Sequence, residues 1–493
     1  MTTPSFGKDR PVDTPPNDDG RSPYEVDADR ILYSAEFRRL AGVTQVIPPQ
    51  EEYVFHDRLT HTLKVAQVAQ RLASYVIRNY SVSQKIKKRD IPIDPQVCYV
   101  AALIHDLGHP PFGHGAESVL QEILEQSASL GTVTNRPILS DSFEGNAQSF
   151  RTVTVLSLRK PAGDPLGLNL TWRSLAAASK YPWLRGEHPS EVPKLAKKWG
   201  FYGSEKSHLD HLKATGLIPS SELAPPRRCI EAEIMDFADD ISYAVHDLED
   251  FFKSGRTPLN YLPYFHSVRS SEWNNLFDYA CDKVYKLLPE LNMEVSKNNH
   301  ETETSLRKMC GVVFEKVILR YIPKIEFQGT RESHANVQSF ASGMIDQLQA
   351  GCSLVGTDVH DLSFKVTLRS RIIAEFLKAL TAFYVIENPL IHTMQQGQRV
   401  AIREIFSYLH HTTVKVFVDG RAKESVLPAR LVEYANLSLR ADLGDSGYRN
   451  DESRLARATV DFMCSLTDRQ ARIIHQRIVG DSPIALSPYA FKL

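Results

Sequence analysis

The sequence predicts a mainly α-helical protein, and three observations favour this fold class. Most segments of the 493-residue chain place their apolar residues with the helical period. Long runs that alternate apolar and polar residues, which are typical of strands, are scarce, and no repeat of fixed length is visible. The hydrophobic content of 42% and the charged content of 24% are ordinary for a folded, soluble protein, and a chain of this length can bury a large core.

The predicted helices each have one apolar face. In the first of them, Tyr33, Phe37 and Leu40 recur at positions i, i+4 and i+7. The pattern is strongest after Arg228, where apolar residues mark one side of the segment for six turns. We predict helices over residues 27–40, 58–79, 95–107, 228–252, 272–289, 304–322, 335–351, 366–385, 394–411, 427–438 and 453–478.

Two segments interrupt this helical pattern. "GHPPFGHG" at 108–115 ends the third helix, because two adjacent prolines among several glycines cannot continue it. Residues 127–225 mix short apolar pieces with Pro, Gly and Asn, which predicts short helices and a small hairpin near 166–170.

Composition excludes several functional classes. The formal net charge is −1, so no overall field attracts nucleic acid or an acidic membrane, and any polyanion site must be a local cluster of Lys and Arg. The six cysteines include no C-x-x-C pair, which favours a reducing, cytoplasmic environment over a disulfide framework. We expect no signal peptide and no membrane span, because no apolar run approaches 18 residues.

Metal-ligand types gather in "AALIHDLGHPPFGHGAE" at 101–117, where His105 and Asp106 end a buried helix. Adjacent helical residues point about 100° apart, so both can bind one ion only at the helix edge. An imidazole and a carboxylate suit Mn, Fe, Co, Mg or catalytic Zn. The alternative is a histidine that hydrogen-bonds its neighbour within a satisfied core.

Further candidate ligands lie on two other predicted helices. His61 lies on a helix that is otherwise aliphatic, where an imidazole needs a partner. Asp239, Tyr243 and Asp247 recur at i, i+4 and i+8 as one polar stripe. Such a stripe often faces solvent, but the apolar residues that flank it favour an internal cleft. On spacing alone, Asp240 fits the ligand position as well as Asp239.

The order His61, His105-Asp106, Asp239 resembles the H…HD…D signature of the HD-domain metal-dependent phosphohydrolases. Longer motifs resemble the deoxyguanosinetriphosphate triphosphohydrolase family within that group, in the same order over residues 38–252. Beyond residue 252 the resemblance is weaker, and "SLTDRQA" is the best late fragment. The motifs are "RRLAGVTQV", "DRLTHTLKV", "HDLGHPPFGHGAE", "FEGNAQ" and "ADDISYAVHDLED".

The resemblance implies an HD-domain helical fold with helical insertions and a helical C-terminal region. The Pro, Asp and Gly content of residues 1–22 predicts a flexible N-terminal arm. The remainder is divided into a catalytic core (23–260) with an insertion (127–225), and a region (261–493) that packs on the core and contributes to oligomer contacts. The resemblance implies a homo-oligomer, with a hexamer as one form. Arg430 is a candidate for an arginine that reaches a neighbouring subunit's pocket, although a surface arginine is the simpler explanation.

The resemblance also implies one divalent metal per subunit, Mn or Mg first and Co, Fe or Zn as alternatives. Its ligands would be His61, His105, Asp106 and Asp239, which leave positions for phosphate and water. His114 and Glu117 correspond to the family's catalytic residues, with His114 as proton carrier or in-line base at the α-phosphate and Glu117 orienting it. His109 either shapes the loop or takes part in the reaction, and it is left out of the catalytic set.

Hydrolysis at the α-phosphorus would release a deoxynucleoside and intact triphosphate, with dGTP as the expected substrate. A triphosphate carries about four negative charges, so several donors are needed. Tyr243 would lie against the deoxyribose and exclude a 2′-hydroxyl, and Asp247 would bind the 3′-hydroxyl. Without the resemblance, Lys198 would be part of a solvated charge run. The expected substrate contacts are Gln45, Arg58, Asn146, Lys180, Tyr181, Lys198, Tyr243 and Asp247.

Two alternative functions share parts of this pattern. An HD-family phosphodiesterase or nucleotidase would share the metal ligands alone, and the "FEGNAQ" motif and the Tyr–Asp stripe disfavour it. A broad-specificity dNTPase regulated by a nucleotide or by single-stranded DNA would share the whole site, but the near-neutral charge disfavours strong DNA binding.

Overall fold

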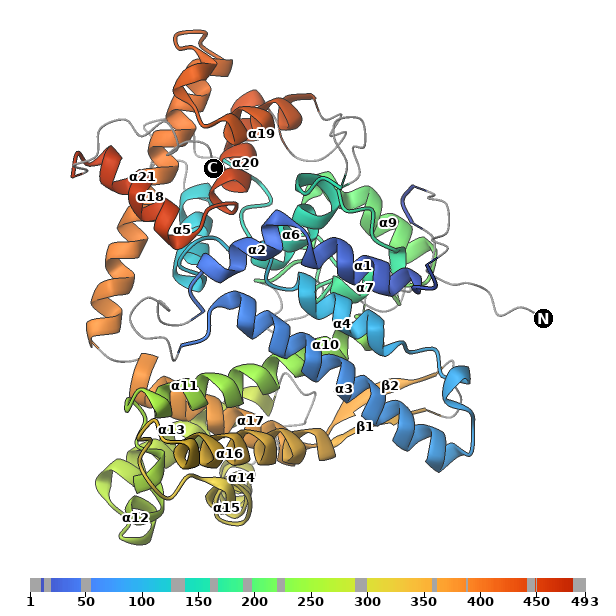
Figure 1. Ribbon diagram of the computed structural model, residues 1–493, viewed down its shortest axis with the longest axis vertical. Coiled ribbons are helices and arrows are strands. Elements are labelled where there is room, and N and C mark those ends of the chain that lie inside the picture. The colour runs from blue at the N-terminus through green and yellow to red at the C-terminus, as the bar shows by residue number, and fades with distance from the viewer. Residues whose placement is uncertain are drawn as a thin grey trace.

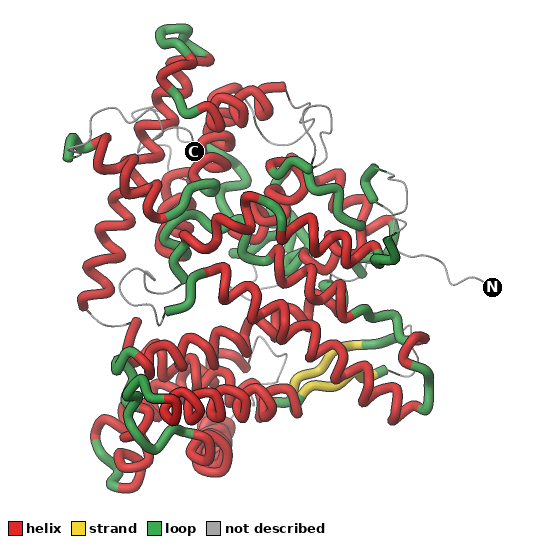
Figure 2. The backbone as a smooth tube through the Cα atoms, in the orientation of Figure 1, coloured by secondary structure: helices red, strands yellow, loops and turns green. Residues whose placement is uncertain are grey.

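The structure is a computed structural model in which nearly every ordered segment is helical (Figures 1 and 2). Within the described residues the only sheet is a two-stranded hairpin. The predicted mainly α fold class is therefore confirmed. The structure describes residues 10–12, 19–45, 55–125, 138–159, 167–188, 197–219, 227–288, 299–356, 361–386, 389–440, 448 and 450–481.

The first half of the chain forms a bundle around the long helix α3 (Arg58–Gln84). Its helices are α1 (Pro23–Leu32), α2 (Ala35–Arg39), α3 (Arg58–Gln84), α4 (Pro95–Ile104), α5 (His114–Glu125), α6 (Gly145–Arg151), α7 (Trp172–Ala178), α9 (Lys206–Ala214), α10 (Ile230–Ser242) and α11 (Leu248–Lys253). Shorter 3-10 and π-helical turns are η1 (Leu40–Gly42), η2 (Lys88–Asp90), η4 (Thr152–Leu156), η5 (Gly203–Glu205) and η6 (Tyr243–Asp247).

The second half adds a lower layer and an upper layer in the view of Figure 1, joined by the long helix α18. Its helices are α12 (Leu262–Ser267), α13 (Ser271–Leu287), α14 (Asn299–Val313), α15 (Leu319–Tyr321), α16 (Arg331–Ala350), α17 (Leu368–Thr381), α18 (Pro389–Phe417), α19 (Ala429–Arg440), α20 (Asp451–Met463) and α21 (Asp468–Ile478). The turns are η7 (Leu259–Tyr261), η9 (Phe314–Ile318), η10 (Ala382–Ile386) and η11 (Glu424–Val426), and the strands are β1 (Cys352–Val355) and β2 (Ser363–Val366).

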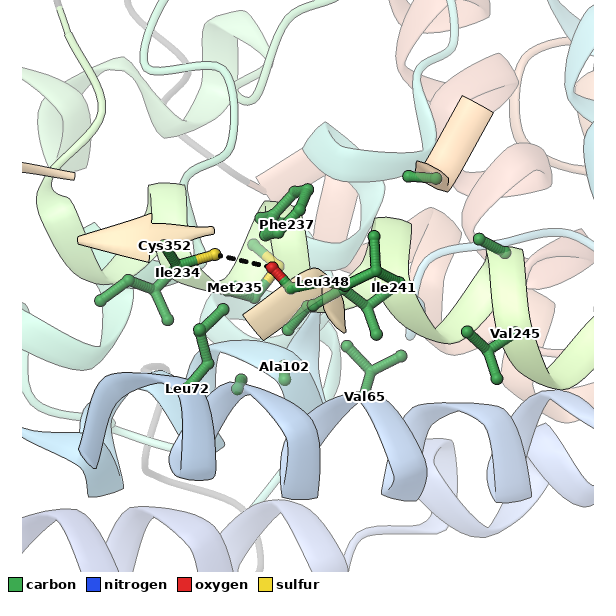
Figure 3. Close-up of a cluster of buried hydrophobic side chains, with 14 of the residues drawn as sticks. Val65, Leu72, Ala102, Ile234, Met235, Phe237, Ile241, Val245, Leu348 and Cys352 are labelled. Carbon is green, nitrogen blue, oxygen red and sulfur yellow. Dashed lines mark hydrogen bonds between the residues drawn. The ribbon is translucent and has the colours of Figure 1, made fainter. Parts of the chain in front are cut away.

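Helix α3 forms the centre of the bundle because α4 and α10 both pack along its apolar face. Figure 3 shows Val65 and Leu72 of α3 facing Ile234 and Ile241 of α10. All four side chains are fully buried. The start of α4 is clear from the sequence, because Pro95 occupies its first position and the Asp94 side chain caps it.

Several predicted boundaries were wrong, and each has a local cause. The helix predicted over 27–40 is two helices, because Ser34 accepts a hydrogen bond from the Phe37 amide and starts α2. The helix predicted over 453–478 is also two, because Thr467 forms a capping box at the start of α21. Residues 167–170 form a turn and irregular backbone, not a hairpin.

The hairpin lies instead in β1 and β2, which pair antiparallel with Cys352 opposite Val366. Both strands have only four residues, which is too short for an alternating pattern to stand out in the sequence. The prediction of a helix over 366–385 was correct from Leu368 onward.

Two hydrophobic clusters make up the main core. The first runs from Tyr24 to Leu380 and joins α3, α4 and α10 to α13, α16 and α17, so it crosses the predicted boundary at residue 260. The second joins α5 to α18, α19, α20 and α21 and begins at Phe112. None of the described helices has both the length and the apolar content needed to cross a bilayer.

Part of the predicted N-terminal arm contacts the core. Arg10 forms an ion pair of 2.5 Å with the fully buried Asp27. The backbone amide of Val12 donates to the Asn169 side chain at 3.1 Å. Residues 1–9 and 13–18 of the arm lie outside the described residues.

Candidate metal centre and active site

Three of the four predicted metal ligands converge from three helices. His61 lies in the first turn of α3, His105 directly follows α4, and Asp239 lies in the last turn of α10. One ligand atom from each of the three residues lies within 4.8 Å of the other two. His61 Nε2 is 3.2 Å from Asp239 Oδ1, and His105 Nε2 is 3.7 Å from the same oxygen.

The hydrogen bonds of this group fit a metal site. His105 Nδ1 donates to the Ala102 carbonyl at 2.6 Å, which leaves the lone pair on Nε2. His105 Nε2 is buried and has no hydrogen-bond partner among the described residues. A buried imidazole nitrogen without a partner is costly unless a cation or donor fills the position. The donor set therefore fits a divalent cation held by imidazole and carboxylate.

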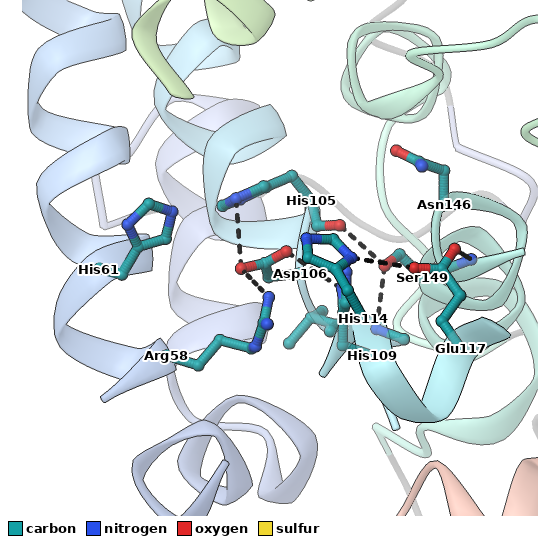
Figure 4. Close-up of polar contacts among 12 residues, drawn as sticks. Arg58, His61, His105, Asp106, His109, His114, Glu117, Asn146 and Ser149 are labelled. Carbon is teal, nitrogen blue, oxygen red and sulfur yellow. Dashed lines mark hydrogen bonds and ion pairs between the residues drawn. The ribbon is translucent and has the colours of Figure 1, made fainter. Parts of the chain in front are cut away.

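Asp106 lies at the side of this group. Its Oδ2 is 3.5 Å from His105 Nε2 and accepts a hydrogen bond from Arg58 Nη1 at 2.6 Å, while Oδ1 lies 3.1 Å from His109 Nδ1 (Figure 4). Burial would raise the pKa of Asp106, but Arg58, His105 and His109 hold it well below its usual range. Asp106 is thus a buried carboxylate, oriented next to the converging atoms.

The neighbouring acids Asp239 and Asp240 point to different partners. Asp240 forms ion pairs with Lys378 at 2.6 Å and with Arg371 at 3.3 Å, both on α17. Asp239 faces His61 and His105. Burial would raise the pKa of Asp239, but the histidines lower it below its usual value. The structure thus separates two residues that spacing alone left equivalent.

The turn after Asp106 is held close to α6. Gly108 N donates to Ser149 Oγ at 2.9 Å, and Ser149 Oγ donates to the His105 carbonyl at 3.0 Å. A Cβ on Gly108 would lie 2.2 Å from the Ser149 backbone nitrogen, so only glycine allows this approach. The "HDLGH" glycine therefore lets α6 pack against the ligand-bearing turn.

The loop that follows is fastened by the C-terminal part of the chain. Phe112 has a left-handed backbone with φ of 68°, which is uncommon for a residue other than glycine. Its amide donates to Asp468 Oδ1 at 2.8 Å, and the Thr44 amide donates to Asp468 Oδ2 at 3.0 Å. Arg39 donates to the carbonyl groups of Leu107 and His109 at 2.9 and 2.8 Å.

This loop presents the predicted catalytic pair. His114 Nδ1 lies 3.1 Å from Glu117 Oε2, and the side chain of His114 is 74% exposed while that of Glu117 is 6% exposed. Burial would raise the pKa of Glu117, but the hydrogen bond from His114 and the charge of Lys198 hold it well below its usual range. A charged, buried carboxylate thus orients an accessible imidazole.

Lys198 bridges this pair to the "FEGNAQ" motif. Its Nζ is 3.1 Å from Glu117 Oε1 and 3.0 Å from Glu144 Oε1. Asn146 Nδ2 donates to Glu144 Oε1 at 2.9 Å. Glu144 is fully buried and caps α6, and burial raises its pKa even though Lys198 opposes this. Two of the predicted substrate contacts, Asn146 and Lys198, therefore lie together beside Glu117.

Two further predicted contacts are Lys180, which lies beside Asp239, and Tyr181, which follows Lys180 in the chain. Lys180 Nζ is 2.6 Å from Asp236 Oδ1 and 3.7 Å from Asp239 Oδ2. Tyr181 is 7% exposed and packs in a small aromatic cluster with Trp183 and Trp199. Lys180 thus lies next to the proposed ligand Asp239, and Tyr181 is held within a buried aromatic cluster.

The polar stripe of α10 continues into η6. Tyr243 is half-buried, and burial together with Asp247 raises the pKa of its hydroxyl. Asp247 is 4% exposed, its Oδ2 has no hydrogen-bond partner among the described residues, and burial raises its pKa well above the usual value. An unpartnered buried carboxyl group is costly unless a ligand supplies the missing hydrogen bond.

The other predicted contacts have different environments. Arg58 is 1% exposed, and besides Asp106 it donates to the Thr44 carbonyl at 3.4 Å, so its guanidinium orients Asp106 here. Its contact with phosphate stays a prediction. Gln45 Oε1 is buried without a partner among the described residues, next to the Thr44 that Asp468 holds. Arg430 lies on α19 and is half-buried.

Sequence reasoning missed four residues that shape the site. They are Arg39, Glu144, Asp236 and Asp468, and each acts through a partner distant in the chain. Glu144 stood within a recognised motif, and the position of Asp468 in "SLTDRQA" was the only signal for the C-terminal contact.

Comparisons with known proteins agree with this geometry. A family model of the HD domain matches residues 58–145. Three relatives bear the name deoxyguanosinetriphosphate triphosphohydrolase-like protein. The relative from Mesorhizobium japonicum is 40% identical, and the match covers 96% of this chain and 97% of the relative. The relative from Vibrio parahaemolyticus is 35% identical, and the match covers 94% of each chain. The relative from Streptomyces coelicolor is 30% identical, and the match covers 94% of this chain and 93% of the relative. The chain therefore belongs to the deoxyguanosinetriphosphate triphosphohydrolase-like family of HD-domain phosphohydrolases.

Proposed function

We propose that this protein hydrolyses dGTP at the α-phosphorus and releases deoxyguanosine and inorganic triphosphate, with other dNTPs as secondary substrates. The observation that carries the proposal is the convergence of His61, His105 and Asp239 beside an accessible His114 that a buried Glu117 orients. The names of the relatives support the same substrate class.

His61, His105, Asp106 and Asp239 would hold one divalent cation, with Mn²⁺ or Mg²⁺ as our first choice and Co, Fe or Zn as alternatives. When bound, the cation supplies charge neutralisation for phosphate oxygens. Arg58 keeps Asp106 ionised and oriented, and the Ala102 carbonyl keeps the lone pair of His105 on Nε2.

His114 would carry the proton at the α-phosphate. Because Nδ1 faces Glu117 at 3.1 Å, Nε2 is the nitrogen that accepts or gives a proton toward a reacting group. Glu117 fixes this tautomer and stabilises the imidazolium that forms. Lys198, Lys180 and Asn146 would bind the remaining phosphates, and Lys198 would exchange a carboxylate partner for phosphate as substrate enters.

The sugar end would be read by Tyr243, Asp247 and Gln45. Asp247 and Gln45 each have a buried oxygen without a partner among the described residues, which suits the hydroxyl groups of a deoxyribose. Tyr243 precedes Asp247 by one turn, so its ring would contact the sugar and disfavour a 2′-hydroxyl. Tyr181 would pack beside the phosphates.

The direct test is to identify the phosphate product. Purified protein is incubated with dGTP and Mn²⁺, and the products are separated by anion-exchange chromatography. Tripolyphosphate with an equal amount of deoxyguanosine is the expected result. Orthophosphate would indicate a nucleotidase or another HD phosphohydrolase, and hydrolysis of a cyclic nucleotide alone would indicate a phosphodiesterase.

The remaining features of the proposal concern assembly and regulation. We propose a cytoplasmic homo-oligomer, with a hexamer as one form and Arg430 as a candidate for a residue directed at a neighbouring pocket. A broad-specificity dNTPase that a nucleotide or single-stranded DNA activates is the second candidate, since the proposed phosphate and sugar contacts do not select among the four bases. Rates for all four dNTPs with and without such effectors decide between the two.

A further inference from the structure

A groove lies on the outer side of α3, away from the candidate active site. It has a volume of about 520 Å³, within the usual range for small-molecule sites. Helix α3 forms one wall, η2 and the start of α4 close one end, and the C-terminal part of α16 forms the other wall. The lining residues are Gln70, Arg71, Ser74, Tyr75, Arg78, Lys88, Pro95, Asp346 and Gln349.

The lining of this α3 groove is positively charged. Arg71, Arg78 and Lys88 contribute three cations against the single carboxylate of Asp346. Within the described part of the chain, no ion pair joins any of the three cations to an acid. Arg58 of the candidate active site differs from these three cations, because it forms an ion pair with Asp106. Three like charges that share one groove repel each other, so an anion that enters it relieves this repulsion.

The spacing of the cations suits an extended anion. Arg71 and Arg78 are two turns apart on the same face of α3, about 10 Å along the helix axis. Ser74 and Tyr75 lie between them, and the Arg78 guanidinium lies 5.8 Å from the centre of the Tyr75 ring. The groove therefore offers positive charges at two points, with the aromatic surface of Tyr75 between them.

We infer that the α3 groove binds a ligand that carries a chain of phosphates, separately from the candidate active site. Arginine forms paired hydrogen bonds with phosphate oxygens, and a polyphosphate chain has enough charge to match three cations. Arg71 lies ten residues beyond His61, which is about 15 Å along the axis of α3, and the two sites share no residue. The inference goes beyond the proposed activity and does not depend on it.

The test counts binding sites for inorganic tripolyphosphate by titration calorimetry on full-length protein freed of metal by dialysis. The double variant Arg71→Glu/Arg78→Glu reverses both charges on α3, and because both side chains are exposed we expect the fold to be preserved. We expect the wild type to bind one more tripolyphosphate per chain than this variant. Equal numbers of sites in the two proteins would overturn the inference.

Arg89→Glu is the matched control. Arg89 is next to Lys88 and 77% exposed, but it does not line the groove. This variant should keep the wild-type number of sites, and an equal loss would show diffuse charge attraction and overturn the inference. A second arm uses ATP. Similar affinities for ATP and tripolyphosphate indicate that a free phosphate chain is enough, whereas tighter ATP binding that Tyr75→Ala removes indicates a nucleotide.

Discussion

The two halves of the candidate active site are held by different hydrophobic cores. His61, His105 and Asp239 stand on α3, α4 and α10, whose apolar faces belong to the first cluster. His114 and Glu117 stand on α5, which belongs to the second cluster with α18 to α21. The change from one core to the other falls within "LGHPPF", because Leu107 packs in the first cluster and Phe112 in the second.

This difference separates two tasks. The first core holds His61, His105 and Asp106 buried and Asp239 half-buried, in or directly after regular helices, and an ion pair with Arg58 fixes the charge of Asp106. The second core holds an accessible imidazole at the start of α5, directly after a loop whose position depends on hydrogen bonds to Asp468 and Arg39. We therefore expect changes in the first core to affect metal binding, and changes in the second to affect turnover with the metal still bound.

The largest expected effect is at Asp239. Asp239→Asn should remove the charge of one ligand and lower the amount of bound Mn²⁺. We expect kcat to fall by about a hundredfold to a thousandfold. Asp240→Asn is the matched control, because that side chain pairs with Lys378 and Arg371. The control should keep its metal and lose at most about 1 kcal/mol of stability. Metal analysis measures bound Mn²⁺ and dGTP assays measure kcat in the two variants. Equal loss of metal in Asp239→Asn and Asp240→Asn would contradict the assignment of Asp239 as a ligand.

His114→Gln tests the other core. We expect kcat to fall by about 10²–10⁴-fold, the range for loss of a general acid or base, while bound Mn²⁺ is unchanged. The side chain is 74% exposed, so the midpoint of thermal unfolding should also be unchanged. His392→Gln, on the exposed surface of α18, should have no effect on either. A His114→Gln protein that loses its metal would place this residue with the ligands and remove the distinction between the two halves.

Asp468→Asn tests whether the C-terminal helices position the loop. Its two carboxylate oxygens hold Phe112 and Thr44, and an amide can accept only one of these hydrogen bonds. Because small misplacements of a reacting group are costly, we expect kcat to fall by up to about a hundredfold with little change in KM.

A purely structural role of Asp468 would give a different result. In that case the thermal midpoint of Asp468→Asn would fall while kcat, measured well below that midpoint, stayed at the wild-type value. Bound Mn²⁺ should be unchanged in either case, since Asp468 contacts none of the proposed ligands.

Tyr243→Ala returns to the first core and should have a smaller effect, on selectivity alone. Without the ring, a 2′-hydroxyl meets less resistance, so the ratio of kcat/KM for dGTP over GTP should fall by about tenfold. Tyr243→Phe keeps the ring and should keep the ratio. An unchanged ratio in Tyr243→Ala would remove this residue from sugar selection.

The two cores also differ in how far the sequence reveals them. The helices of the first core and the residues His61, His105 and Asp239 could be predicted, because helical spacing and short motifs are local signals. Helical spacing alone left Asp239 and Asp240 equivalent, because the ion pair that occupies Asp240 comes from Lys378 on α17, and the family motif made the choice. The role of Asp468 could not be predicted from local signals either, because its partner Phe112 lies 356 positions away in the chain.

The second core contains a buried histidine that makes its stability depend on pH. His410 on α18 is 2% exposed, and burial lowers its pKa from 6.5 to about 4. Above pH 6.5 the residue is neutral in both folded and unfolded chains, so it makes no pH-dependent contribution. As the pH falls from 6.5 toward 4, only the unfolded chain gains this proton, so stability is lost.

His410→Phe removes this proton uptake and keeps a ring beside Phe406. Since one pKa unit corresponds to about 1.4 kcal/mol, the loss of stability between pH 7 and pH 4 should be smaller in the variant by at most about 3 kcal/mol. Urea unfolding at several pH values, followed by circular dichroism, measures this difference. His392→Phe, whose side chain is exposed, should follow the wild type. If His410→Phe also follows the wild type, acid does not act on the second core through His410.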